Sequence, residues 1–156
     1  MKLLIVDDDI WLCSALSRGL VRLGHFARTA ASVDSALALI ESEAPAAVLT
    51  DLDLGPGGNG VELICRMRGA GSTVPAIMMT GSDPVVARAR LGGAGLDETA
   101  LLEKPFEFEE LMKKLAALFP ELAAAAPSVR PSRPTPAAAM ATMVGSVVRS
   151  LGGRVL

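Results

Sequence analysis

The sequence predicts an α/β fold in which helices cover both faces of a parallel sheet. Short apolar runs alternate with helical segments five times along the chain, and four of these runs are apolar almost throughout. Such alternation requires right-handed crossovers, which place the strands parallel to one another. Strands buried on both faces are continuously apolar, which fits these runs. We therefore expect one domain built on a doubly wound sheet.

The first half of the chain predicts two strands, each followed by a helix. The run LLIV at 3–6 stops at three aspartates, and the helix after it, at 10–24, has four leucines at helical spacing. The segment FARTA at 26–30 is a weaker strand candidate. Ser32 is placed to cap a helix that continues to Ile40.

The second half repeats this pattern three times. The expected strands lie at 46–50, 75–80 and 100–103, and the expected helices lie at 60–68, from Pro84 onward, and at 108–119. Asp83 followed by Pro84 is a favourable cap and first-turn pair for a helix. The last helix is strongly amphipathic and ends at Pro120.

The composition of the chain changes after residue 119. Residues 120–136 hold five of the ten prolines among Ala, Ser and Arg, which predicts a semi-rigid Pro/Ala-rich linker. Residues 137–156 carry apolar side chains at the spacing of one helix face, so this tail is either a short amphipathic helix or a disordered segment. The tail is too short for an autonomous helix-turn-helix domain, so we expect no direct binding of nucleic acid.

Composition and charge exclude several classes of protein. Lys and Arg total 15 against 17 Asp and Glu, for a net charge of −2, which gives no general indication of nucleic-acid binding. The first apolar run is too short for a signal peptide, and the longest uncharged run, at 134–148, is too short and too polar to span a membrane. Cys13 and Cys65 are expected to be free thiols on helices that cover opposite faces of the sheet. We expect a cytoplasmic protein without a membrane partner.

Polar side chains stand where the apolar strands end: the aspartates at 7–9, Asp51, Thr80 and Lys104. In a doubly wound sheet the ligand site lies beyond the carboxyl ends of the strands, so these groups should converge. Crowded carboxylates are unfavourable without a cation, and their hard oxygens suit Mg²⁺ or Mn²⁺. With a lysine that can pair with phosphate and a threonine hydroxyl, the set predicts phosphoryl transfer to a carboxylate, and Asp51 is the expected nucleophile.

The stretch TDLDLGPGGNG also allows two other interpretations. Its glycines have the G-x-G-x-x-G spacing of a dinucleotide-binding turn, but that turn falls directly between the strand and the helix of a first βα unit. Asp51 and Asp53 form the D-x-D of some metal-dependent phosphohydrolases, where Asp53 would act as a general acid and base. That motif is usually near the chain start with Thr or Val next, whereas Leu54 follows here. We prefer the third interpretation, in which the glycines shape the loop after Asp51.

Four motifs together, LLIVDDD, VLTDLDL, IMMTG and LLEKPF, resemble the response regulator receiver domain of two-component signalling in their order and separation. The resemblance covers about residues 1–119. It implies a flavodoxin-like (βα)₅ fold with strand order 2-1-3-4-5. It also implies a signalling domain that assists only its own phosphorylation and dephosphorylation, with a histidine kinase or histidine phosphotransfer protein as donor and a protein as downstream partner. We expect a monomer or a weak homodimer.

The resemblance also implies a role for each site residue. Asp7, Asp8, Asp51 and the backbone carbonyl of Asp53 would bind Mg²⁺. Asp51 would accept the phosphoryl group, Thr80 would bond one of its oxygens, and Lys104 would pair with it. The peptide bond between Lys104 and Pro105 would be cis, as an X–Pro bond permits.

One departure from the family pattern concerns activation, and another concerns the length of a loop. Receiver domains often carry Tyr or Phe three residues before the lysine, as a rotamer switch coupled to the threonine. The corresponding residue here is Leu101, and the chain has no Tyr. Gly60 also falls nine residues after Asp51 instead of the common eight, which predicts a loop one residue longer. The missing aromatic favours an alternative function, an interaction module with the same fold that works without phosphorylation, whereas the complete set of Asp7, Asp8, Asp51, Thr80 and Lys104 argues against it.

Overall fold

The computed structural model describes residues 1–96 and 99–120. Within them, five strands alternate with five α-helices and one short 3₁₀ turn. The strands are β1 (Lys2–Val6), β2 (Phe26–Ala30), β3 (Ala47–Asp51), β4 (Ala76–Thr80) and β5 (Ala100–Glu103). The helices are α1 (Ile10–Arg22), α2 (Val33–Glu43), η1 (Gly55–Gly57), α3 (Gly60–Gly69), α4 (Pro84–Gly93) and α5 (Phe108–Leu118).

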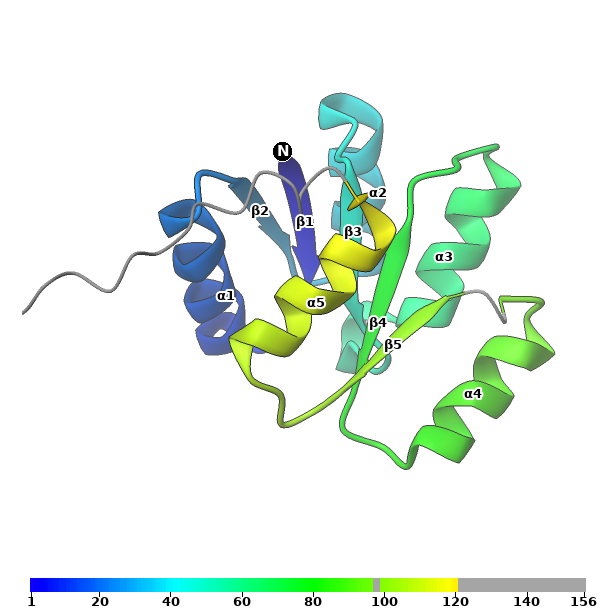
Figure 1. The fold of residues 1–156 in the computed structure, drawn as a ribbon. Coiled ribbons are helices and arrows are strands. Elements are labelled where there is room, and N and C mark those ends of the chain that lie inside the picture. The colour runs from blue at the N-terminus through cyan, green and yellow to red at the C-terminus, as the bar shows by residue number, and fades with distance from the viewer. Residues whose placement is uncertain (97–98, 121–156) are drawn as a thin grey trace, which may run out of the picture. The chain divides into compact units, whose positions relative to one another are not determined.

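All strand pairs are parallel, and the order across the sheet is β2-β1-β3-β4-β5 (Figure 1). The predicted flavodoxin-like fold is therefore confirmed. The predicted linker at 120–136, apart from its first residue, and the segment at 137–156 lie outside the described residues. Among the residues that the structure describes, no helix is both long enough and apolar enough to cross a membrane.

Side chains cap the N-termini of α1, α2 and α4. Asp9 accepts hydrogen bonds from the backbone N–H groups of Trp11 and Leu12 and so caps α1. Ser32 caps α2 in a reciprocal capping box, and Asp83 caps α4 just before a proline. These caps satisfy N–H groups that have no partner within their own helix.

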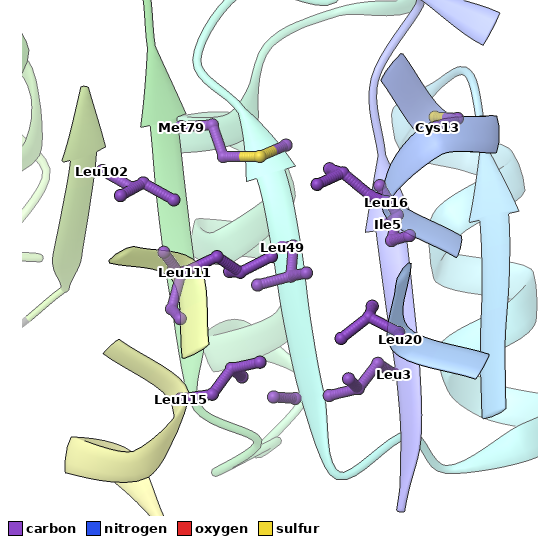
Figure 2. Close-up of a cluster of buried hydrophobic side chains, with 12 residues drawn as sticks. Leu3, Ile5, Cys13, Leu16, Leu20, Leu49, Met79, Leu102, Leu111 and Leu115 are labelled. Atoms are coloured by element: carbon purple, nitrogen blue, oxygen red, sulfur yellow. The ribbon is translucent and has the colours of Figure 1, made fainter. Parts of the chain in front are cut away.

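Three apolar clusters fix the layers of the fold. Figure 2 shows the first cluster, in which leucines of α1 and α5 pack on side chains of the central strands. The second joins α2 and α3 to the opposite face of β1 and β3. The third joins α3 and α4 to β4 and β5. Helices α1 and α5 thus cover one face, and α2, α3 and α4 cover the other, as a doubly wound sheet requires.

Several predicted boundaries are wrong by one to three residues, among them the end of the second helix and the bounds of the third strand. The second helix continues past Ile40 to Glu43, and it ends where Ala44 adopts a left-handed conformation just before Pro45. Strand β3 includes Asp51, because the backbone of Asp51 stays in register with Met79 of β4. This acidic residue is thus held by the sheet itself and not by the loop that follows.

Candidate functional site

An acidic cluster lies at the carboxyl ends of β1 and β3. Asp7, Asp8 and Asp51 each offer a carboxylate oxygen, and these three atoms lie within 4.8 Å of one another. Asp7 is only 1% exposed, and its Oδ1 accepts a hydrogen bond of 2.9 Å from the backbone N–H of Asp9. Asp8 is exposed and Asp51 is half-buried. The cluster thus has a buried base and an open side toward solvent.

Lys104 bridges two of these carboxylates. Its Nζ lies 2.7 Å from Asp7 Oδ2 and 3.1 Å from Asp51 Oδ2. The lysine is anchored at the end of β5 because its backbone N–H donates to the Thr80 carbonyl, and its peptide bond to Pro105 is cis. Burial lowers the pKa of Lys104, but the hydrogen bond that its ammonium donates to Asp7 and the charges of both aspartates outweigh burial and raise that pKa overall.

The environment of Asp51 opposes its charge. Burial raises the pKa of Asp51 above its ordinary value, and the neighbouring charge of Lys104 lowers it by less. The charge of Asp7 raises it further. One carboxylate oxygen accepts a hydrogen bond of 2.8 Å from the backbone N–H of Leu52, which fixes the orientation of the group. An ionised Asp51 in this place favours the arrival of a further cation.

Thr80 ends β4 beside this cluster. It is buried, and its Oγ1 accepts a hydrogen bond of 3.0 Å from the backbone N–H of Ser82. Leu101, the residue expected to replace the aromatic switch, is buried among Leu52, Ala87 and Leu91. This side chain therefore packs against α4 and has no polar atom with which to change partners.

The two parts of Asp53 face different surroundings. Residues 53 and 59 form an isolated antiparallel bridge whose hydrogen bonds run from Leu54 N to the Gly58 carbonyl and from Gly60 N to the Leu52 carbonyl. The Asp53 carbonyl therefore takes no part in the hydrogen bonds of this bridge. Its carboxylate pairs with Arg90 Nη1 of α4 at 2.9 Å. The carboxylate of Asp53 is not part of the acidic cluster, so the geometry gives no support to the phosphohydrolase interpretation.

The glycines after Asp51 serve close packing and turning. A Cβ atom on Gly60 would overlap the Asp51 carbonyl oxygen and lie 2.8 Å from Met78 Sδ, so only glycine lets α3 begin so close to β3. Gly55 and Gly57 form the 3₁₀ turn before that helix. The preferred interpretation of the glycine-rich stretch agrees with these observations.

Most of the residues selected from the sequence meet in one place. Asp7, Asp8, Asp51 and Lys104 are in mutual reach, and Thr80 joins them through the backbone bond from Lys104. Two features of the site region were not predicted from the sequence. The ion pair of Arg90 with Asp53 left no sequence signal, because 37 residues separate its partners. The close packing at Gly60 was detectable only as an unusual spacing.

The donor set is consistent with binding of Mg²⁺. Three carboxylates supply hard oxygens within a small volume, and the Asp53 carbonyl stands close in sequence to Asp51. Mg²⁺ is commonly held by one or two carboxylates together with waters and phosphate oxygens. A cation would also relieve the repulsion that remains after Lys104 has paired with Asp7 and Asp51.

Comparisons with known proteins show the family of this chain. Residues 3–116 match the family described as the response regulator receiver domain. The response regulator MprA of Mycolicibacterium vanbaalenii is 35% identical over 118 residues, which are 76% of this chain and 50% of that protein. The transcriptional regulatory protein TctD of Salmonella typhimurium is 34% identical, over 76% of this chain and 51% of that protein.

Solved structures give the same result for the fold. A putative response regulator from Chloroflexus aurantiacus is 34% identical with a TM-score of 0.66, over 75% of this chain and 95% of that one. The chemotaxis protein CheY4 of Vibrio cholerae is 28% identical with a TM-score of 0.68, over 74% of this chain and 96% of that one. Both solved structures thus share the fold of this chain.

The chain belongs to the response regulator receiver domain family of two-component systems. It spans about half the length of the curated relatives that it matches. One of these relatives is named a transcriptional regulatory protein, so the expectation that this protein does not contact nucleic acid directly finds no support.

Proposed function

We propose that Asp51 accepts a phosphoryl group from a phosphohistidine and that the protein signals by the resulting change in its affinity for a partner. One observation carries this proposal: Lys104 Nζ lies 3.1 Å from a carboxylate oxygen of Asp51, which belongs to the acidic cluster. A phosphoryl group on Asp51 would arrive beside a positive charge that the fold already holds in place.

The transfer requires a nucleophile and charge compensation. A carboxylate oxygen of Asp51 attacks phosphorus, the bond from phosphorus to the donor's histidine nitrogen breaks, and that nitrogen keeps the electron pair and later takes up a proton. Lys104 pairs with the transferred group through an ammonium that Asp7 orients from below. Mg²⁺ held by Asp7, Asp8, Asp51 and the Asp53 carbonyl would offset the charge of the phosphoryl oxygens.

Thr80 supplies the connection from the phosphoryl group to the rest of the fold. Its hydroxyl accepts from Ser82 N and so retains its own proton for donation. Donation to a phosphoryl oxygen would draw Thr80 toward Asp51 and change the loop that leads to α4. Phosphorylation would then shift a population between two arrangements of this region.

The donor is a histidine kinase or a histidine phosphotransfer protein. Ile10 and Trp11, 68% and 80% exposed, begin α1 directly after the aspartates. Large apolar side chains so exposed next to a polar site suit a docking protein. The downstream partner is a protein that senses the loop after Thr80 and the start of α4, where Val85 and Val86 are exposed.

Intact-mass measurement tests the proposal. The purified protein is incubated with Mg²⁺ and acetyl phosphate, and its mass should increase by one phosphoryl group. The same protein in EDTA and the variant Asp51→Asn should show no increase, because the amide is a poor nucleophile. A wild-type protein that takes up no phosphoryl group would instead favour an interaction module that works without phosphorylation.

A further inference from the structure

The helix α4 is fastened to the domain by two arginines as well as by a narrow apolar face. Its fully buried side chains are those of Ala87 and Leu91. Arg88 donates a hydrogen bond of 2.8 Å to the Thr99 carbonyl, just before β5. Arg90 pairs at 2.9 Å with Asp53, on the opposite side of β4. The position of α4 therefore depends on polar contacts with two different segments.

The second of these segments leads directly to the proposed acceptor. Asp53 is two residues from Asp51, and between them Leu52 is buried in the same apolar cluster as Ala87 and Leu91. The backbone of Asp53 is held by the bridge to Asn59. A shift at the end of β3 would thus reach α4 through a polar contact at Asp53 and an apolar contact at Leu52.

We propose that the Arg90–Asp53 ion pair couples the state of the acceptor site to the position of α4. The inference rests on the proposed phosphorylation of Asp51 and names a route for its signal. Leu101 cannot exchange hydrogen-bond partners, so a polar contact elsewhere would have to carry the signal from the acceptor site to α4. Phosphorylation that moves the Asp53 backbone would tighten or release the pair and bias α4 between two arrangements.

The exposure of the pair determines how large the effect should be. The side chains of Arg90 and Asp53 are 50% and 60% exposed, so water and salt screen their attraction. Such a pair adds little to global stability. It can still bias a two-state element, where a coupling of about two- to fivefold is in the range of exposed ion pairs.

Amide hydrogen exchange of α4 measures this coupling. Exchange at residues 84–93 is compared in the apo protein and in protein saturated with Mg²⁺ and beryllofluoride, an analogue of the phosphoryl group. In the wild type, beryllofluoride should change the exchange rates of α4 by about two- to fivefold. In Arg90→Gln and in Asp53→Asn that change should fall by at least about half, and the double variant should lose no more than either single variant.

Arg66→Gln is the matched control. Arg66 of α3 pairs with Asp34 at the same distance of 2.9 Å, with exposures of 48% and 86%, but in a different part of the domain. This variant removes the same charge and should keep the full response of α4. Phosphoryl uptake measured by mass should persist in Arg90→Gln and in the control.

The outcomes separate two kinds of failure. If Arg90→Gln takes up the phosphoryl group and α4 still shows the full response, the coupling is wrong and the proposed function stands. If losses in Asp53→Asn and Arg90→Gln add in the double variant, the two side chains do not act as a pair and the coupling is equally wrong. If the wild type takes up no phosphoryl group, the proposed function fails, and this inference fails with it.

Discussion

Replacing Asp8 by alanine should stabilise the metal-free protein. The carboxylate oxygens of Asp7, Asp8 and Asp51 lie within 4.8 Å of one another. Two like charges at that separation repel by about 1 kcal/mol in surroundings like water and by about 3 kcal/mol at an effective dielectric constant near 20. Asp8 is exposed, so the lower value applies to each of its two like-charged neighbours.

The ammonium of Lys104 offsets part of this repulsion, because it contacts both Asp7 and Asp51. We therefore expect a net gain of about 1 kcal/mol in the free energy of unfolding, which corresponds to about 4 °C in melting temperature for a domain of this size. The gain should appear in EDTA, where the carboxylates face one another without a cation.

Mg²⁺ should reverse the comparison between the two proteins. At about ten times its dissociation constant, a ligand that binds only the folded state adds about 1.4 kcal/mol. Wild type should gain this increment, and Asp8→Ala should lose most of it. Thermal melts in EDTA and in increasing Mg²⁺ measure both effects, with Asp34→Ala as a control that removes an equal charge outside the cluster. If Asp8→Ala melts no higher than wild type in EDTA and responds equally to Mg²⁺, Asp8 is neither a crowded charge nor a ligand.

Three further predictions concern packing and titration. Gly60→Ala should lower the free energy of unfolding by about 2–3 kcal/mol in urea titrations, because its Cβ would overlap the Asp51 carbonyl; an unchanged midpoint would show that α3 can move away freely. Iodoacetamide should modify only the exposed Cys65 of the native protein, because burial and the charges of nearby aspartates raise the pKa of Cys13 to about 11; rapid double modification would contradict this. Burial raises the pKa of Asp51, so its contribution to stability is present below the unfolded pKa and is lost as pH rises through the folded pKa. Without metal, the free energy of unfolding of Asp51→Asn should therefore rise relative to that of wild type as pH increases from 4 to 7, as measured by urea titration. A difference in free energy between the two proteins that does not change with pH would be evidence against this.

The fold could be predicted from the sequence because local and global signals agree. Strands that are buried on both faces appear as short apolar runs, and Ser32 and Asp83 mark helix starts by their capping chemistry. The convergence of Asp51 and Lys104 follows from topology, since the carboxyl ends of parallel strands share one edge. These features depend on residue type and order alone.

Other features depend on side-chain positions that only the folded chain defines. The partner of Arg90 is 37 residues away in the sequence. No sequence pattern indicates which acidic residue an exposed arginine on a helix will pair with. Lys104 contacts both Asp7 and Asp51, at 2.7 and 3.1 Å. These distances cannot be predicted from the spacing of the three residues along the chain. The end of β3 was misplaced because the sheet register, and not the polarity of Asp51, decides where that strand stops.

Chemical mapping of the acceptor tests the central claim most directly. The protein is incubated with Mg²⁺ and acetyl phosphate and then reduced with borohydride, which converts an aspartyl phosphate to homoserine. Peptide sequencing by mass spectrometry should find homoserine at position 51, and only in protein that has been exposed to the donor. Homoserine at position 53, or an unmodified Asp51 in fully phosphorylated protein, would contradict the account.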